Sequence, residues 1–245
     1  MVYHTRKSGL KAMLGGIFAF YLGVTPAMIL SNNAEGGPRQ DSNPKPEVAS
    51  LVPELRWDSF TKSDYIKQVV PVMQETFKSH WGERGQTLDR KVTEEVLGYN
   101  FDASVESRTP LMLMTSLCLW ESKGNPEALG DLDKAPNIAI GYCQMRVKTA
   151  KELLKEMKEE GYTGLPDRID PASFRYDYKT QARLAHRYFR TSLDRQLSFG
   201  RSPEEARRLS VRNYQKGMYS EGTDDTPYLR VVRSRYVQLK RRIRV

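Results

Sequence analysis

The chain has 245 residues, of which 39% are hydrophobic and 28% are charged, a composition that excludes a largely disordered protein. Its formal net charge is +9 at pH 7, and residues 201–245, with 12 basic and 5 acidic groups, hold +7 of that charge. A basic segment of this kind fits a nucleic-acid-binding protein, and it fits a solvated basic face equally well. Once terminal segments are set aside, the length allows one domain of moderate size.

Residues 1–30 predict an export signal or a single membrane anchor. Arg6, Lys7 and Lys11 precede an apolar run of 19 residues from Ala12 to Leu30. This length lies at the boundary between a signal-peptide core and a membrane-spanning helix. The positive flank orients the N-terminus towards the cytoplasm. We therefore expect a periplasmic protein that is either exported or anchored to the inner membrane.

Residues 31–56 are rich in Asn, Gly, Pro and Ser and lack helical or strand periodicity, which predicts a flexible linker. Residues 57–110 are expected to form a helical extension of the domain that follows. Their apolar positions recur at helical spacing up to Trp81, and Pro71 is expected to kink or split that helix. A second, short helix is expected around Val92.

Residues 111–245 are expected to form the main domain, with few strand signals. Amphipathic helices are predicted over residues 150–160 and 180–197. A loop or small strand pair is expected over residues 129–140, and a loop over residues 161–171. The predicted fold class is therefore mainly α.

Two further helices are predicted from their starting residues. Ser202-Pro203 and Thr226-Pro227 are each typical of an N-cap followed by a first-turn proline. The first of these helices is expected to end at Gly217, because glycine commonly ends helices.

The most apolar stretch of the domain ends in a single carboxylic acid. Leu111–Trp120 contains only Thr115 and Ser116 as polar residues, which predicts a buried helix. Glu121 follows at the C-terminal end of this helix, where the helix dipole and the neighbouring Trp120 disfavour the ionised carboxylate and raise its pKa. A carboxyl that stays protonated near neutral pH can act as a general acid.

Four short motifs follow in order from this glutamate. Glu-Ser-Lys-Gly-Asn-Pro-Glu-Ala begins at Glu121, Gly-Tyr-Cys-Gln-Met at Gly141, Thr-Ala-Lys-Glu-Leu at Thr149 and Asn-Tyr-Gln-Lys-Gly at Asn213. Together they resemble the catalytic core of the lytic transglycosylases related to goose-type lysozyme, over roughly residues 111–242. Several ordered motifs are more specific than any single one.

The resemblance implies a lysozyme-like helical domain that cleaves the β-1,4 bond between N-acetylmuramic acid and N-acetylglucosamine in peptidoglycan glycan strands. The product would be a 1,6-anhydromuramic end, and no cofactor is implied. Glu121 would be the catalytic acid. Substrate-binding roles carry over to Ser122, Tyr142, Gln144, Tyr214 and Gln215.

The chain departs from the family pattern in two places. Tyr142 and Cys143 stand where the family usually has Leu and Met, and Gln215 stands in the usual place of Asn. The first change keeps a packed wall, while the second alters a position that contacts substrate in the family.

The expected partners follow from the predicted export and the family resemblance. Peptidoglycan stem peptides and wall polymers are anionic, so the basic segment of an exported chain needs no nucleic acid to explain it. By analogy, the chain would serve a secretion, conjugation or phage system that opens the wall locally.

Several alternatives stay open. A goose-type lysozyme would use water in place of the C6 hydroxyl, and a non-catalytic peptidoglycan-binding protein would tolerate loss of Glu121. A nucleic-acid binder would show salt-dependent affinity for DNA and no muralytic activity. Asp131 or Asp133 could serve as a second catalytic carboxylate, although acids in such a loop are usually turn formers.

The chain has two cysteines, Cys118 and Cys143. Export would permit a disulfide between them. One lies in the predicted buried helix and the other at a wall position, so we expect two buried thiols. The three histidines follow no ligand spacing, so a metal site is not expected.

Overall fold

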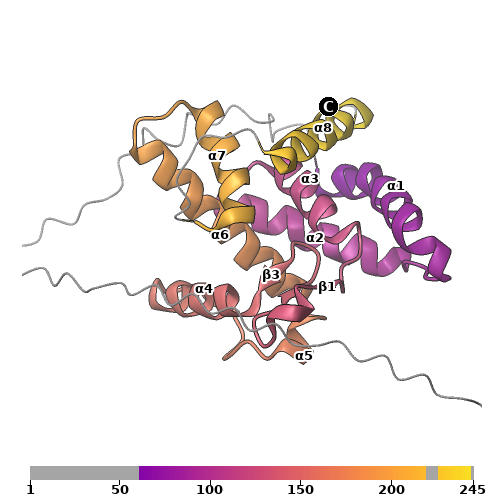
Figure 1. The fold of residues 1–245 in the computed structure, drawn as a ribbon, viewed down its shortest axis with the longest axis horizontal. Helices are drawn as coiled ribbons and strands as arrows, with labels where there is room; N and C mark the ends of the chain where they lie inside the picture. The colour runs from indigo at the N-terminus through magenta and orange to yellow at the C-terminus, as the bar shows by residue number, and fades with distance from the viewer. Residues whose placement is uncertain (1–60, 219–225, 244–245) are drawn as a thin grey trace, which may run out of the picture. The chain divides into compact units, whose positions relative to one another are not determined.

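The computed structural model describes residues 61–218 and 226–243, most of which are helical (Figure 1). The predicted mainly α class is confirmed. The expected signal or anchor in residues 1–30 and the expected linker in residues 31–56 lie outside the described residues. None of the described helices has the length and apolar character needed to cross a membrane.

The first described helix, α1 (Lys62–Trp81), begins with a capping box in which Thr61 and Asp64 hydrogen-bond to each other's backbone amides. Of the two outcomes expected at Pro71, a kink or a split, the split does not occur, and α1 passes through this residue as one helix. Val70 and Met73, on either side of the proline, are buried. We infer that their packing offsets the lost backbone hydrogen bond. A short 3-10 helix, η2 (Gly82–Arg84), follows α1.

The second helix, α2 (Arg90–Ser107), is longer than the short helix expected around Val92. Asp89 caps its N-terminus by accepting hydrogen bonds from the amides of Lys91 and Val92. Polar residues are buried along it, so the hydrophobic pattern understated its length. These polar residues are Thr93, Asn100 and Ser104.

The predicted buried helix is α3 (Leu111–Ser122), and every residue from Leu111 to Leu119 is buried. The helix ends with Lys123 and Gly124 in the left-handed region, at φ 54° and φ 77°. A Cβ atom on Gly124 would lie 2.9 Å from the Met73 carbonyl oxygen of α1. Glycine therefore lets the chain leave α3 directly against α1.

The expected loop or strand pair is a small antiparallel sheet of three strands, β1 (Leu129–Gly130), β2 (Ala139–Ile140) and β3 (Met145–Arg146). Leu129 pairs with Ile140, and Ile140 pairs with Met145. A 3-10 helix, η3 (Leu132–Lys134), lies between β1 and β2. Two-residue strands are too short for periodicity to reveal, which is why the third strand was missed.

In the described part of the chain, five helices follow the small sheet. They are α4 (Val147–Glu159), α5 (Pro171–Phe174), α6 (Tyr178–Ser198), α7 (Pro203–Lys216) and α8 (Pro227–Arg242). Ser202 and Thr226 cap α7 and α8 as predicted. The single turn of α5, capped by Asp170, falls within and just after the expected loop over 161–171. Helix α6 packs on α2 and α7, and α8 packs along α3 (Figure 1).

A hydrogen-bonded network of polar side chains lies inside the core, and its five members are at most 2% exposed. Asn100 Nδ2 donates to the Tyr65 hydroxyl at 2.9 Å and to Thr115 Oγ1 at 3.1 Å. His186 Nε2 donates to Asn100 Oδ1 at 3.0 Å, and His186 Nδ1 accepts from the Thr109 hydroxyl. Each group has a partner, so the network joins α1, α2, α3 and α6 without an unsatisfied donor.

The neutral state of His186 gives a testable pH dependence of stability. Burial lowers the pKa of His186 to about 3, whereas an unfolded histidine titrates near 6.5. Below pH 6.5 this histidine therefore binds a proton in the unfolded chain but not in the folded chain. The free energy of unfolding falls as the pH drops from 6.5 towards 3. Over this range His186 lowers the free energy of unfolding by about 1.4 kcal/mol for each unit that the pH falls.

Urea unfolding of the full chain between pH 7 and 4.5 checks this slope. His186→Gln should lose the slope due to this residue, while His80→Gln, at a solvent-exposed position on α1, should keep it. An NMR titration in which the His186 ring protonates near pH 6.5 in the folded chain would contradict the prediction.

Candidate functional site

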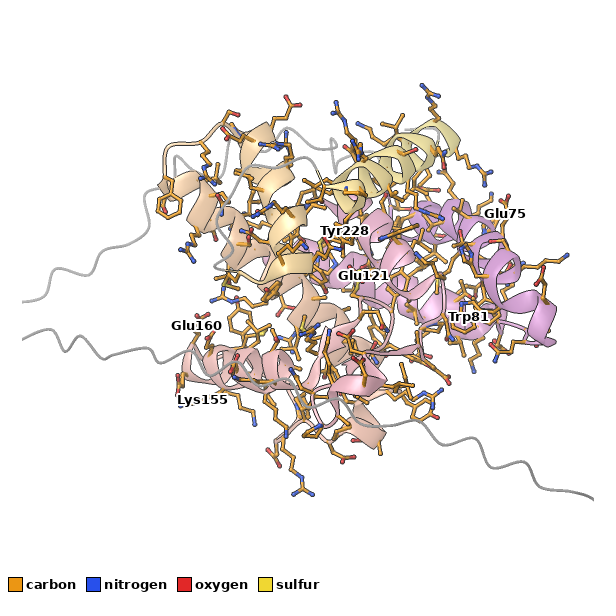
Figure 2. The ribbon with its side chains drawn as sticks, in the orientation of Figure 1. Glu75, Trp81, Glu121, Lys155, Glu160 and Tyr228 are labelled. Atoms are coloured by element: carbon orange, nitrogen blue, oxygen red, sulfur yellow. A yellow bond between two sulfur atoms is a disulfide. The ribbon has the colours of Figure 1, made fainter. Side chains whose placement is uncertain are left out.

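Glu121 lies in the last turn of α3 and is partly buried. Its carboxylate oxygen Oε1 accepts a hydrogen bond from the hydroxyl of Tyr228, in the first turn of α8. Figure 2 shows the two side chains next to each other where α3 and α8 meet. The packing of α8 on α3 thus supplies the direct partner of the predicted catalytic acid.

The pKa of the Glu121 carboxyl is raised above its usual value, mainly because burial disfavours the charged form. The hydrogen bond from Tyr228 and the charge of Lys123 act in the opposite direction, and the charge of Asp131 adds to the rise. The raised pKa expected from the sequence is therefore found, and burial is its main cause. A carboxyl of this kind can give up a proton to a bound oxygen.

The ring of Trp120, the residue before Glu121, contacts two cations. Lys123 Nζ is 3.0 Å from the centre of the indole ring and donates to the Trp120 carbonyl oxygen at 2.7 Å. The Arg235 guanidinium from α8 is 5.4 Å from the same ring centre. Burial and the charge of Arg235 lower the pKa of Lys123 to about 8. These contacts join the end of α3 to α8 a second time.

A pocket of about 450 Å³ opens beside Glu121. Its walls come from the small sheet, the start of α4, α6 and the C-terminal end of α7. Of the residues predicted to bind substrate, Gln144, Tyr214 and Gln215 line this pocket together with Glu121. Residues about 20 and 90 positions apart in the sequence are thereby brought to one site.

Gln144 is a fixed part of the wall. Its backbone is left-handed at φ 51°, and its Nε2 donates to the carbonyl oxygens of Ala128, at 3.0 Å, and Gly141, at 2.9 Å. A Cβ atom on Gly130 would lie 2.3 Å from Gln144 Oε1. Gly130 is therefore required for the Gln144 amide to lie across β1.

Tyr214 is another part of the pocket wall. Its hydroxyl donates to the carbonyl oxygen of Cys143 at 3.0 Å, and its ring packs edge-on against Tyr188 with ring centres 5.4 Å apart. Burial and the charge of Glu121 raise the pKa of Tyr214 well above its usual value, so the phenol stays neutral. Gln215, the next residue, is exposed at the rim.

Two predicted substrate-binding residues do not line the pocket. Ser122 is buried, and its hydroxyl donates to the Cys118 carbonyl oxygen at 2.9 Å. Tyr142 is 4% exposed, and its backbone amide donates to Gln181 Oε1 at 3.1 Å. Neither residue lines the pocket, although Glu121 and Gln144, close to them in the sequence, do.

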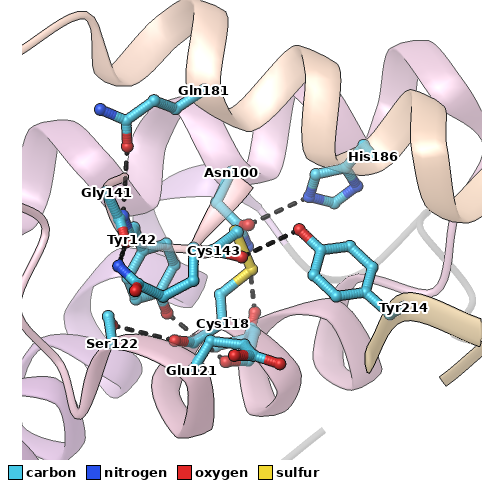
Figure 3. The surroundings of a disulfide bond; sticks show 12 residues. Asn100, Cys118, Glu121, Ser122, Gly141, Tyr142, Cys143, Gln181, His186 and Tyr214 are labelled. Carbon is cyan, nitrogen blue, oxygen red and sulfur yellow. Dashed lines mark hydrogen bonds between the residues drawn. A yellow bond between two sulfur atoms is a disulfide. The ribbon is translucent and has the colours of Figure 1, made fainter. Parts of the chain in front are cut away.

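The prediction of two free thiols is wrong, because Cys118 and Cys143 form a disulfide (Figure 3). Cys118 lies on α3 less than one turn before Glu121, and Cys143 lies in the loop between Tyr142 and Gln144. The two positions are 25 residues apart in sequence, and sequence reasoning placed both in packed surroundings without showing that they touch. The bond joins the helix that carries the acid to the pocket wall.

The structure separates the two candidate second carboxylates. Asp131 lines the pocket and pairs with Arg146 at 2.6 Å and Lys134 at 3.3 Å. Burial pushes its pKa up, but the hydrogen bond from Lys134 and the charges of Arg146 and Lys134 outweigh it and lower the pKa. Asp133 is exposed in η3 and does not line the pocket. Within residues 61–218 and 226–243, no group of three or more His, Cys, Asp or Glu side chains is arranged to hold a metal ion.

Tyr228 was not identified from the sequence. It lies one helical turn before Val232, another buried residue of α8, and it is 7% exposed. A buried tyrosine hydroxyl usually needs a hydrogen-bond partner. That rule was the signal that could have linked Tyr228 to a polar group of the core.

No known protein-family model matches this chain, and a search of curated proteins finds no match either.

Replacing Tyr228 tests the electrostatics of the site. Tyr228→Phe should raise the pKa of Glu121 further, because the ionised carboxylate loses a hydrogen bond that stabilises it. The change can be followed by ¹³C NMR of the glutamate carboxyl carbons. Tyr188→Phe, which also alters a pocket tyrosine, is the control and should leave the Glu121 pKa near the wild-type value. A lower pKa in Tyr228→Phe would contradict the assignment.

The disulfide predicts a dependence of stability on redox state. Reduction should lower the free energy of unfolding by roughly 3 kcal/mol, the amount expected for opening a loop of this length. Urea unfolding with and without a phosphine reductant measures the difference. The double variant Cys118→Ala, Cys143→Ala is the control and should unfold identically in both conditions. An unchanged unfolding midpoint for the reduced wild type would contradict the prediction.

Proposed function

We propose that this chain is a murein lytic transglycosylase with a lysozyme-like helical domain, exported to the periplasm or anchored to the inner membrane. The observation that carries the proposal is a single glutamate with a raised pKa, at the end of a buried helix and on the wall of a polar pocket. Gln144 and Tyr214, which match motif positions of that family, line the same pocket, as does Gln215, which stands where the family usually has Asn.

The proposed reaction uses Glu121 twice. The protonated carboxyl first gives its proton to the glycosidic oxygen between N-acetylmuramic acid and N-acetylglucosamine, since the sugar leaves poorly as an alkoxide. The carboxylate that results then takes the proton of the muramic C6 hydroxyl. That oxygen bonds to C1 and closes the 1,6-anhydro ring, so no water is consumed and no cofactor is required.

Tyr228 has a specific part in this cycle. Its hydroxyl donates to Glu121 Oε1 and therefore stabilises the carboxylate that exists between the two proton transfers. It also holds the Glu121 side chain in one orientation. Tyr228 is a positioning residue, because it acts on the substrate through Glu121.

The pocket favours this route over an ordinary retaining hydrolysis, which needs a second carboxylate roughly 5 Å from the first. Asp131 is the other acid that lines the pocket, and Arg146 and Lys134 already hold its carboxylate oxygens. By resemblance to the family, the substrate's own acetamido group would stabilise the cationic intermediate instead.

The disulfide supports the proposed location. Structural disulfides persist in oxidising compartments such as the periplasm and are rare in the cytosol. The proposed partners are peptidoglycan glycan strands and, by analogy, a secretion, conjugation or phage system that opens the wall locally.

Glu121→Gln is the decisive test. The amide can still accept the Tyr228 hydrogen bond but has no transferable proton, so activity on purified sacculi should fall by roughly 100-fold to 10,000-fold. The melting temperature should hold or rise, because the amide replaces a carboxyl that burial already disfavours as an ion. Asp133→Asn removes an exposed acid outside the pocket and should keep full activity.

Mass spectrometry of the released fragments separates the candidate functions. The wild-type chain should release muropeptides with 1,6-anhydromuramic ends. Reducing muramic ends would instead indicate a goose-type lysozyme. Full activity of the Glu121→Gln chain would overturn the catalytic assignment, and sacculus binding without release by the wild type would leave a peptidoglycan-binding protein.

A further inference from the structure

A second cavity, of about 330 Å³, lies between α7 and α8 and shares no lining residue with the Glu121 pocket. Its apolar surface comes from three helices. Leu113 of α3, Val211 of α7, and Leu229 and Val232 of α8 are buried side chains that line it. Val237, also in the lining, is 39% exposed. We call this cavity the α7–α8 groove.

Cations surround the apolar surface of the α7–α8 groove. Arg207, Arg208 and Arg233 line it together with one acid, Glu204. Arg207 Nη1 is buried and has no hydrogen-bond partner among the described residues. A buried guanidinium nitrogen without an acceptor is costly, and an anionic oxygen at this point would satisfy it.

Positively charged residues continue along α8 beyond the groove. Arg230, Arg233, Lys240 and Arg241 are exposed on this helix, and no acidic residue lies within Pro227–Arg242. Such a helix is attracted to the negative surface of a membrane that contains anionic lipids. The groove and the basic face of α8 therefore favour the same kind of partner.

The arginines and the apolar side chains together limit the class of ligand that would fit the groove. A small inorganic anion would use the arginines and leave the apolar surface uncovered, and an uncharged apolar ligand would leave Arg207 without an acceptor. A phospholipid with an anionic headgroup carries both a phosphate and an acyl chain. Arginine binds phosphate well because its guanidinium matches two phosphate oxygens.

We propose that the α7–α8 groove binds an anionic phospholipid, with the phosphate at Arg207 and Arg233 and an acyl chain over Val232 and Val237. The site goes beyond the proposed glycan cleavage and does not depend on it. Its role would be to hold this face of the domain at the membrane.

The test uses the full chain in a non-ionic detergent. Dihexanoyl phosphatidylglycerol, added below its critical micelle concentration, should raise the melting temperature in a saturable manner, because a ligand that binds the folded state stabilises it. Dihexanoyl phosphatidylcholine, which has the same acyl chains and no net charge, should bind at least about tenfold more weakly. Inorganic phosphate and polyglutamate serve as soluble anions without an acyl chain and should give no comparable shift.

Variants assign the effect to the groove. Arg207→Gln with Arg233→Gln should abolish the shift caused by phosphatidylglycerol, and Val237→Asp should weaken it at least about tenfold by removing an apolar contact. Lys151→Gln with Lys155→Gln changes the net charge by the same amount on exposed positions of α4 and should keep the wild-type shift. The melting temperature of each variant without lipid reports whether it is folded, and Arg233→Gln alone, at an exposed position, provides a milder test.

Four results would overturn the proposal. These are the absence of any saturable shift, equal shifts with both lipids, an equal shift with phosphate or polyglutamate, and a wild-type shift in a folded Arg207→Gln, Arg233→Gln chain. None of them depends on muralytic activity, so failure of this proposal and failure of the proposed function are distinguishable.

Discussion

Burial of α3 is the constraint on which the candidate site depends. Because α2 and α8 pack along this helix and every residue from Leu111 to Leu119 is buried, its last turn carries Glu121 out of water. Desolvation is the largest cause of the raised pKa of that carboxyl. A helix with the same glutamate on an open surface would leave the carboxyl ionised at neutral pH.

The position of α3 is fixed by polar contacts as well as by apolar packing. Near its middle, Thr115 accepts hydrogen bonds in the buried network that contains Asn100 and His186. Towards its end, Cys118 is bonded to Cys143, whose carbonyl oxygen accepts from Tyr214 (Figure 3). A rotation or shift of α3 would break contacts of both kinds. Hydrogen bonds have strict geometry, so they specify one orientation of the helix where apolar packing alone tolerates several.

The sequence predicted most of the helices and part of the site. Helices α3, α7 and α8 carry strong local signals, namely an apolar run or an N-cap followed by proline. The full length of α2 was missed because its buried face is partly polar, and α5 because it is a single turn.

Three further errors concern contacts between residues distant in sequence. The disulfide, the Tyr228 hydrogen bond and the burial of Tyr142 depend on how helices pack against each other. Hydrophobic periodicity reports which face of a helix is buried and does not report what that face meets. Glu121 could be singled out because it ends the apolar run of its own helix and begins a short local motif, both of which are visible in the sequence.

The balance of forces on Glu121 suits the proposed reaction. A group that gives a proton and then takes one back works best when neither form is strongly favoured. Burial and the charge of Asp131 favour the neutral acid, whereas Tyr228 and Lys123 favour the carboxylate. Without burial the neutral acid that makes the first proton transfer would be less favoured, and without Tyr228 the carboxylate would form at a higher free energy. The packing of α8 on α3 brings the Tyr228 hydroxyl to Glu121, so this helix contact supplies the hydrogen bond that opposes the effect of burial.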